Sequence, residues 1–73
     1  MSQAIINLIN SANSSEIIAT SGWVSIKTPS GVIEVTPEEN NPETCFVSGA
    51  DYRGHIATKA ITQQGIAEYF SKY

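Results

Sequence analysis

The chain has 73 residues, of which seven are acidic and four basic, and its formal net charge is −3. This length allows one domain, residues 1–73, and a domain this small buries only about 60% of the surface that its unfolded chain exposes. A pocket that holds a cofactor, on the order of 300 Å³ or more, would take up much of such a core. Most enzyme classes are therefore disfavoured, and we expect neither a catalytic site nor a cofactor.

The composition is that of a folded chain built around a sheet. Hydrophobic residues make up 41% of the sequence and charged residues 15%, which is not the pattern of a disordered chain. Ten isoleucines and one leucine favour strands, because β-branched side chains suit a pleated surface. The single cysteine cannot form an internal disulfide. Together with the single histidine it falls short of the four ligands of a structural zinc site, so we expect no bound metal.

The first part of the chain is predicted to form a helix followed by a strand. In residues 2–12, apolar side chains recur at the spacing that lines one helix face. These side chains are Ile5, Leu8, Ile9 and Ala12. Residues 16–20 fit either an extension of this helix or the start of a strand, and the sequence leaves both open. Residues 23–28 alternate as a strand does.

The clearest local signal is a turn at residues 28–31. Pro29 pre-sets the backbone for the second turn position, and Gly31 accepts a positive φ at its end. Strand-like residues 32–36 follow at once, so a β-hairpin is predicted. Residues 36–43 contain two prolines and two adjacent asparagines, which predicts a loop.

The second half is predicted to complete a small sheet and end in a helix. Residues 44–48 read as a third strand, residues 49–54 as a turn-rich connection, and residues 55–61 as a fourth strand. Thr62 is expected to cap a C-terminal helix. The predicted fold is α+β with two layers, in the order α-β-β-β-β-α. An antiparallel meander sheet of three to four strands carries the N-terminal and C-terminal helices on one face.

His55 is the one candidate for a general base or a single metal ligand. No second histidine or cysteine lies at ligand spacing, so a histidine at the surface or at a sheet edge is the simpler interpretation. Asp51, Arg53 and His55 fall within five residues, around Gly49 and Gly54. They are the nearest thing in the sequence to a small-ligand or catalytic site. The competing interpretation is a solvated turn.

The acidic residues gather in one segment. Glu34, Glu38, Glu39 and Glu43 lie within ten residues, with no basic residue among them and without the spacing of a calcium-binding loop. The cluster predicts either a solubilising loop or a negative patch for a basic partner surface. Cys45 follows this acidic neighbourhood, which would raise its pKa. We therefore interpret Cys45 as a small core residue rather than a nucleophile.

Trp23 is the residue whose environment the sequence leaves most open. It alternates with Val24 and Ile26, so it points to the outer face if those two residues face the core. An exposed tryptophan close to Lys27 would be a natural binding hot spot. Burial by helices or by a second subunit is the alternative.

These features favour a non-enzymatic protein-binding module in the cytoplasm. No secretory signal and no apolar run of membrane-spanning length is visible, and four lysines and arginines are too few for direct nucleic-acid binding. Small acidic proteins of this kind are common among phage and mobile-element products that inhibit or regulate host complexes, including defence systems. The partner would be a protein, and a basic nucleic-acid-binding surface on it would suit the glutamates. The expected partner-binding residues are Trp23, Glu38, Glu39, Glu43, Tyr52 and Arg53.

Two other functions stay open on the sequence alone. One is a self-associating structural or accessory protein, since the edges of an open sheet tend to pair and a homodimer would enlarge the core. The other is a small ligand-binding or enzymatic domain centred on Asp51, Arg53 and His55, which requires these three side chains to converge on one pocket.

Overall fold

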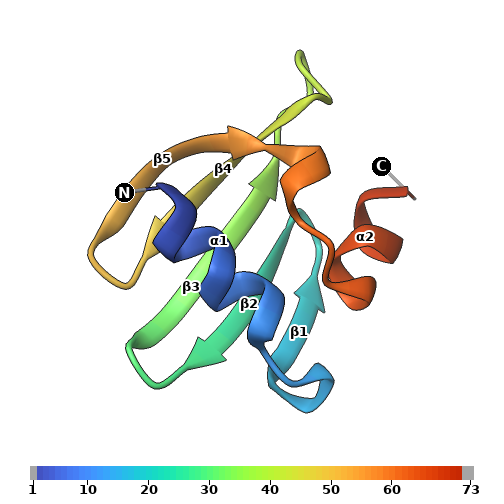
Figure 1. Ribbon diagram of the computed structural model, residues 1–73. Coiled ribbons are helices and arrows are strands. Elements are labelled where there is room, and N and C mark those ends of the chain that lie inside the picture. Colours follow the sequence, from blue (N-terminus) through green and yellow to red (C-terminus); the bar gives the residue numbers. More distant parts are fainter. Residues whose placement is uncertain (1, 72–73) are drawn as a thin grey trace.

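The computed structural model of the protein describes residues 2–71. Its centre is a five-stranded antiparallel sheet in which the strands lie side by side in chain order (Figure 1). The elements are α1 (Ser2–Ser11), β1 (Ile17–Thr20), β2 (Trp23–Thr28), β3 (Gly31–Pro37), β4 (Thr44–Gly49), β5 (Tyr52–Ala57) and α2 (Gln64–Ser71). Short 3-10 turns occupy Ser14–Glu16 and Thr58–Ala60. The predicted α+β meander with a helix at each end is confirmed, with five strands instead of three to four.

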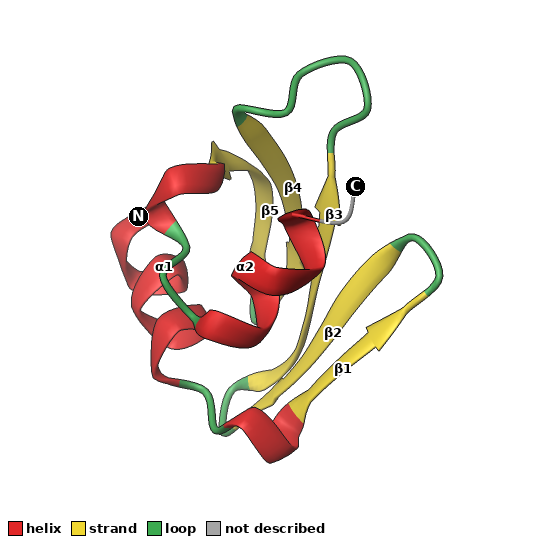
Figure 2. Cartoon of the chain, turned by 90° about the vertical axis from the view of Figure 1, so that its right-hand side faces the viewer, coloured by secondary structure: helices red, strands yellow, loops and turns green. Residues whose placement is uncertain are grey.

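The core lies between the sheet and the helices. Both helices cover the same face of the sheet, and no element within residues 2–71 covers the other face (Figure 2). Every second residue of the central strands is fully buried against the helices, as the alternation of the sequence requires. The buried residues are Ile5, Ile9, Val24, Ile26, Ile33, Val35, Cys45, Val47, Ile56, Ile61, Ile66 and Tyr69. Isoleucine and valine thus supply most of the core.

The additional strand is β1, which occupies the segment that the sequence left between helix and strand. It pairs with β2 across a two-residue turn at Ser21 and Gly22, where Gly22 has a φ of 103° that favours glycine. The hydroxyl of Tyr69 in α2 accepts the Gly22 N–H and donates to the carbonyl of Thr20, both at 3.0 Å. Tertiary contact with α2 therefore holds residues 17–20 as a hairpin strand.

The predicted fourth strand was wrong in its boundaries. β5 begins at Tyr52, three residues earlier than expected, because the β4–β5 loop has only two residues, Ala50 and Asp51, with φ of 52° and 63°. Two successive left-handed residues form the tight turn that suits the twist of a hairpin. Gly54 was assigned to the turn on composition, but it lies within the strand. The strand ends at Ala57, and the 3-10 turn follows.

A side-chain amide of α1 directs the chain from β5 into α2. The Nδ2 of Asn10 donates to the carbonyl of Ala60 at 3.0 Å, and its Oδ1 accepts the N–H groups of Thr62 and Gln63 at 2.9 and 3.2 Å. Gln63 returns the contact by donating its Nε2 to the carbonyl of Ala12 at 2.6 Å. Thr62 was expected to cap the last helix, but α2 begins at Gln64, and the N–H of Thr62 is bound by Asn10.

Replacing Asn10 by alanine is expected to lower the free energy of unfolding by about 2 kcal/mol, because three hydrogen bonds, two of them partly buried, are lost together. Urea denaturation followed by tryptophan fluorescence measures this change. Asn7→Ala is the matched control, since Asn7 lies on the same helix and its amide bonds only the exposed side chain of Gln3. Equal stability of the two variants would contradict the role given to Asn10.

Candidate functional site

The candidate site is the uncovered face of the sheet, called here the outer face. It is formed by the residues that alternate with the buried ones along each strand. Three large apolar side chains stay exposed on it, Ile18 at 52%, Trp23 at 42% and Val32 at 50%. Its other members are Thr20, Ser25, Lys27, Glu34, Thr36, Thr44, Phe46, Ser48, Arg53, His55 and Ala57. A face with apolar side chains set among polar ones is typical of a contact surface.

Trp23 lies on this outer face and not in the core, so the helices of the chain do not bury it. It is the partner of Thr20 across the β1–β2 pair, and Ile18 lies two residues before Thr20 on the same face. The neighbouring residue Val24 is fully buried and pairs with Val35. The backbone alternation of β2 therefore fixes the direction of the tryptophan side chain.

Phe46 is the second aromatic anchor of the outer face, and the sequence analysis did not single it out. It pairs with Thr36 on one side and with His55 on the other. The Phe46 and His55 rings meet edge to face with centroids 5.2 Å apart, and Cζ of Arg53 lies 5.7 Å from the Phe46 centroid. A cation this close to a ring face is attracted by the ring quadrupole. Phe46 lies between the small apolar residues Cys45 and Val47 in the sequence. This alternation is the signal from which its outward direction could have been predicted.

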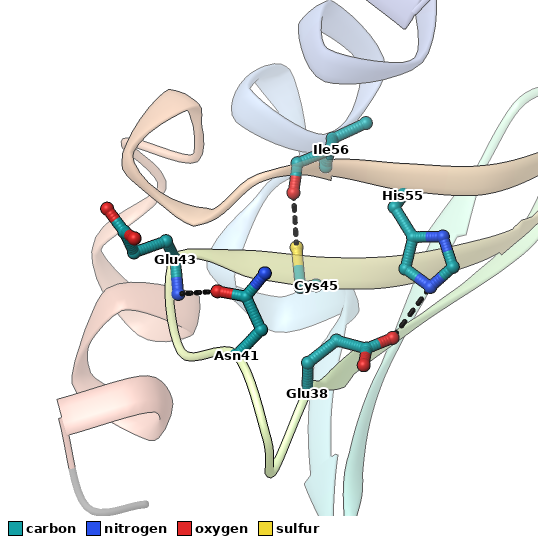
Figure 3. Close-up of polar contacts among 6 residues, drawn as sticks. All are labelled: Glu38, Asn41, Glu43, Cys45, His55 and Ile56. Carbon is teal, nitrogen blue, oxygen red and sulfur yellow. Dashed lines mark hydrogen bonds and ion pairs between the residues drawn. The ribbon is translucent and has the colours of Figure 1, made fainter.

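Glu38 and His55 form the one ion-pair contact among the described residues, with His55 Nε2 2.6 Å from Glu38 Oε1 (Figure 3). The contact ties the start of the acidic loop to the outer face of β5. Further along, the N–H of Glu43 donates to Oδ1 of Asn41 at 3.3 Å, and the N–H of Thr58 donates to the carbonyl of Glu43 at 2.8 Å. Acidic and basic segments that are separate in the sequence thus lie against each other in space.

The glutamates of the predicted acidic patch do not share one environment. Glu38 is half-buried and already contacts a histidine, whereas Glu39 and Glu43 are exposed on the loop. Glu34 lies apart from them, on the outer face of β3 between Ser25 and Ser48. The free carboxylates at the loop end of the molecule are therefore Glu39 and Glu43.

Tyr52 was expected in a loop or on the outer face, and this placement was wrong. It lies in β5 opposite Gly49, on the helix-covered side, where it is half-buried and packs against the core. A Cβ added at Gly54 would lie 3.1 Å from the Tyr52 hydroxyl oxygen, so the side chain lies over that glycine. Tyr52 is therefore not part of the outer face.

The group of Asp51, Arg53 and His55 does not meet in one pocket. Asp51 is in the β4–β5 turn, whereas Arg53 and His55 point to the outer face of an edge strand. A hollow of about 510 Å³ is lined by none of these three residues. Its lining consists of Ser21, Gly22, Thr36, Pro37, Glu38, Glu39, Pro42 and Tyr69.

Cys45 is a core residue, as the sequence analysis expected. Its side chain is fully buried, and its Sγ donates weakly to the carbonyl of Ile56 at 3.8 Å. Burial raises the pKa of the Cys45 thiol to about 11, a contact with Thr58 opposes this, and the charge of Glu38 adds to it. The dominant cause is thus desolvation rather than the acidic neighbourhood. A thiol of this kind stays protonated at neutral pH and is a poor nucleophile.

Within residues 2–71, no group of three or more histidine, cysteine, aspartate or glutamate side chains is placed to hold a metal ion. Neither α1 nor α2 has the length and the continuous apolar stretch that crossing a bilayer requires. Comparison of the chain with protein-family models, with curated protein sequences and with solved structures finds no match. The interpretation of the site therefore rests on its geometry.

The buried Cys45 thiol predicts a loss of stability at alkaline pH. The unfolded thiol releases its proton near its usual pKa of 9.0, whereas the folded thiol holds it up to about pH 11. Since the folded state binds more protons in this window, its stability falls as the pH rises from 9 to 11, by about 2–3 kcal/mol in total. Urea denaturation at several pH values measures the stability of the wild type and of Cys45→Ala.

The difference between the two proteins isolates the thiol, because the tyrosines and lysines that also titrate in this range are common to both. The stability advantage of the wild type should shrink across the window. A difference that stays constant with pH would show that the thiol ionises equally in both states.

Proposed function

We propose that the protein is a non-catalytic protein-binding module that inhibits or regulates a larger protein or nucleoprotein complex. The observation that carries this proposal is the uncovered sheet face on which Trp23 is 42% exposed and Phe46 lies beside Arg53 and His55. Tryptophan and arginine are the residues most enriched in binding hot spots. A rigid sheet presents them without the entropy loss that a flexible loop would suffer on binding.

The charges on the outer face favour a protein as the partner over a nucleic acid. Lys27 and Arg53 are interspersed with Glu34 and Glu38 on the same side of the sheet. A single-strand-binding platform combines stacking aromatics with a continuous positive groove, because it must neutralise phosphates. Alternating charges around apolar anchors are instead the arrangement of a protein interface, with an apolar centre and a polar rim.

The exposed glutamates of the loop extend this surface at one end. Glu39 and Glu43 are exposed and are not held by a basic side chain among the described residues. A partner with lysines or arginines beside its apolar contact region would meet them at the rim. Rim charges act mainly on the association rate and on specificity. A nucleic-acid-binding surface of a host complex has this basic character, which agrees with an inhibitor of the phage or mobile-element type.

Capture experiments test the apolar anchors. The immobilised protein is incubated with a lysate of the producing cell or its host, with and without nuclease, and bound proteins are quantified by mass spectrometry. Trp23→Ala and Phe46→Ala are each expected to reduce a nuclease-resistant partner about 30-fold, which corresponds to a hot-spot loss of about 2 kcal/mol. Glu68→Lys is the control, since Glu68 is exposed on α2, on the opposite side of the sheet.

Urea denaturation followed by far-ultraviolet circular dichroism confirms that each variant is folded before capture is compared, because Trp23 is the single tryptophan of the chain. Unchanged capture by a folded variant that lacks both aromatic side chains would overturn the proposed function. Recovery of only the chain itself would favour self-association in its place.

Reversal of the loop charges is expected to act differently. Glu39→Lys with Glu43→Lys should slow association with the same partner about tenfold at low salt and have little effect on dissociation, because the two carboxylates lie at the rim. Surface plasmon resonance at two salt concentrations measures both rates. Glu16→Lys is the matched control, because Glu16 lies in the turn before β1, outside the acidic loop. If the double reversal leaves the association rate unchanged, the acidic loop does not contribute.

A further inference from the structure

The free edge of the sheet at β5 is open along its backbone. β5 is the last strand of the sheet and pairs only with β4. In an antiparallel pair, alternate residues exchange hydrogen bonds with the neighbouring strand. Glu43 and Thr58 are the next opposite pair beyond Thr44 and Ala57, and the N–H of Thr58 donates to the carbonyl of Glu43. Counting back by two residues, Ile56, Gly54 and Tyr52 therefore direct their backbone N–H and C=O groups to β4. The backbone N–H and C=O groups of Arg53 and His55 therefore point away from the sheet.

The opposite edge, at β1, is closed by contacts of its own. β1 has only four residues, and the N–H of Ile17 donates to the carbonyl of Ser14. The Tyr69 hydroxyl donates to the carbonyl of Thr20, and a Cβ at Gly65 of α2 would lie 3.9 Å from the Ile17 side chain. Short length and cover by a helix are common protections of an edge strand. For Arg53 and His55, no hydrogen bond among the described residues reaches the backbone from beyond the sheet.

The side chains along the β5 edge indicate what kind of strand would fit there. Arg53 is exposed, lies against Phe46, and forms no ion pair within residues 2–71. His55 is held by Glu38. Two further acidic residues flank the edge, Asp51 in the turn before β5 and Glu43 opposite Thr58 beyond its end. The guanidinium of Arg53, the second residue of β5, is thus the positive charge on this edge that no described acidic side chain pairs with.

We propose that β5 is a docking strand, to which an extended segment of the partner adds as a sixth strand with an acidic side chain beside Arg53. Backbone hydrogen bonds to Arg53 and His55 would supply affinity, and the carboxylate would supply specificity on the outer face. This inference deepens the proposed function and rests on it, because the added strand would extend the surface that carries Trp23 and Phe46.

A second copy of the chain fits this edge less well than an acidic segment. Residues opposite each other in an antiparallel pair lie on the same face of the sheet. Self-pairing of β5 centred on Gly54 would place Arg53 of one copy against His55 of the other, and pairing centred on His55 would place the two histidines together. Neither arrangement places an acidic side chain of the second copy opposite Arg53. A partner with an acidic strand does so.

A displayed library of random peptides, selected on the immobilised full chain, tests the proposal. We expect enriched peptides to lack proline and to carry aspartate or glutamate among β-branched residues. Binding of a selected synthetic peptide should slow amide hydrogen exchange at Arg53 and His55, whose amides should exchange faster than those of Gly54 and Ile56 in the free protein. Arg53→Glu should weaken peptide binding about tenfold, and Arg53→Lys much less.

Lys27→Glu is the matched control, because Lys27 is exposed on the same face but lies on β2, away from the β5 edge. The docking strand is ruled out by four results: no enriched peptide, exchange protection confined to other strands, equal effects of Lys27→Glu and Arg53→Glu, or a dimer in size-exclusion chromatography. If any of these occurs while Trp23→Ala still reduces capture about 30-fold, the proposed function stands and only the β5 site fails. If Trp23→Ala and Arg53→Glu both leave capture intact, the proposed function fails as well.

Discussion

The arrangement of the molecule depends on the amide of Asn10. This one side chain binds three backbone groups of the segment that follows β5, and Gln63 binds the end of α1 in return. The exchange joins the end of α1 to the segment that leads into α2. It thereby holds both helices over the same face. The open outer face is a consequence of this link, because the chain has no third helix among its described residues to cover it.

Because the sheet is covered on one side, its inward side chains form the core and its outward side chains face solvent. The inward residues are almost all isoleucine or valine, and even the one cysteine serves as a small apolar residue whose ionisation is suppressed by burial. The outward residues therefore carry the aromatic and arginine side chains that the proposed binding surface uses. Trp23, Phe46 and Arg53 gather there from three different strands. The register of the strands brings them into one surface, so the proposed binding surface depends on the same pairing that stabilises the fold.

Local signals in the sequence predicted the parts of the fold that local chemistry determines. The hairpin at Pro29 and Gly31 was confirmed, because a proline and a glycine at these positions specify a turn without help from the rest of the chain. Residues 17–20 could not be assigned, since isoleucines at this spacing suit a helix or a strand. The hydrogen bonds of Tyr69, 47 and 49 residues away, decide between the two.

The candidate site was predictable only where alternation alone places a side chain. The outward direction of Trp23 could be predicted because it alternates with the apolar residues Val24 and Ile26. The same reasoning applied to Phe46, which lies between Cys45 and Val47, would have identified the second outward aromatic side chain. The contact of Glu38 with His55 spans 17 residues and depends on strand register, which the sequence does not reveal. Gly54 misled the assignment of β5, because a glycine beneath the Tyr52 side chain looks the same in the sequence as a glycine in a turn.

The chain order of the strands has a consequence for how the protein folds. Each strand pairs with the one next to it in the sequence, so each hairpin closes only a short loop as it forms. Sheets built from such local contacts fold faster than sheets whose strands cross over, because less chain entropy is lost before the first stabilising contacts appear. The contacts of Asn10 with Thr62 and Gln63, more than 50 residues apart, close the longest loop. We therefore expect the two helices to dock last, after the meander has set the strand order.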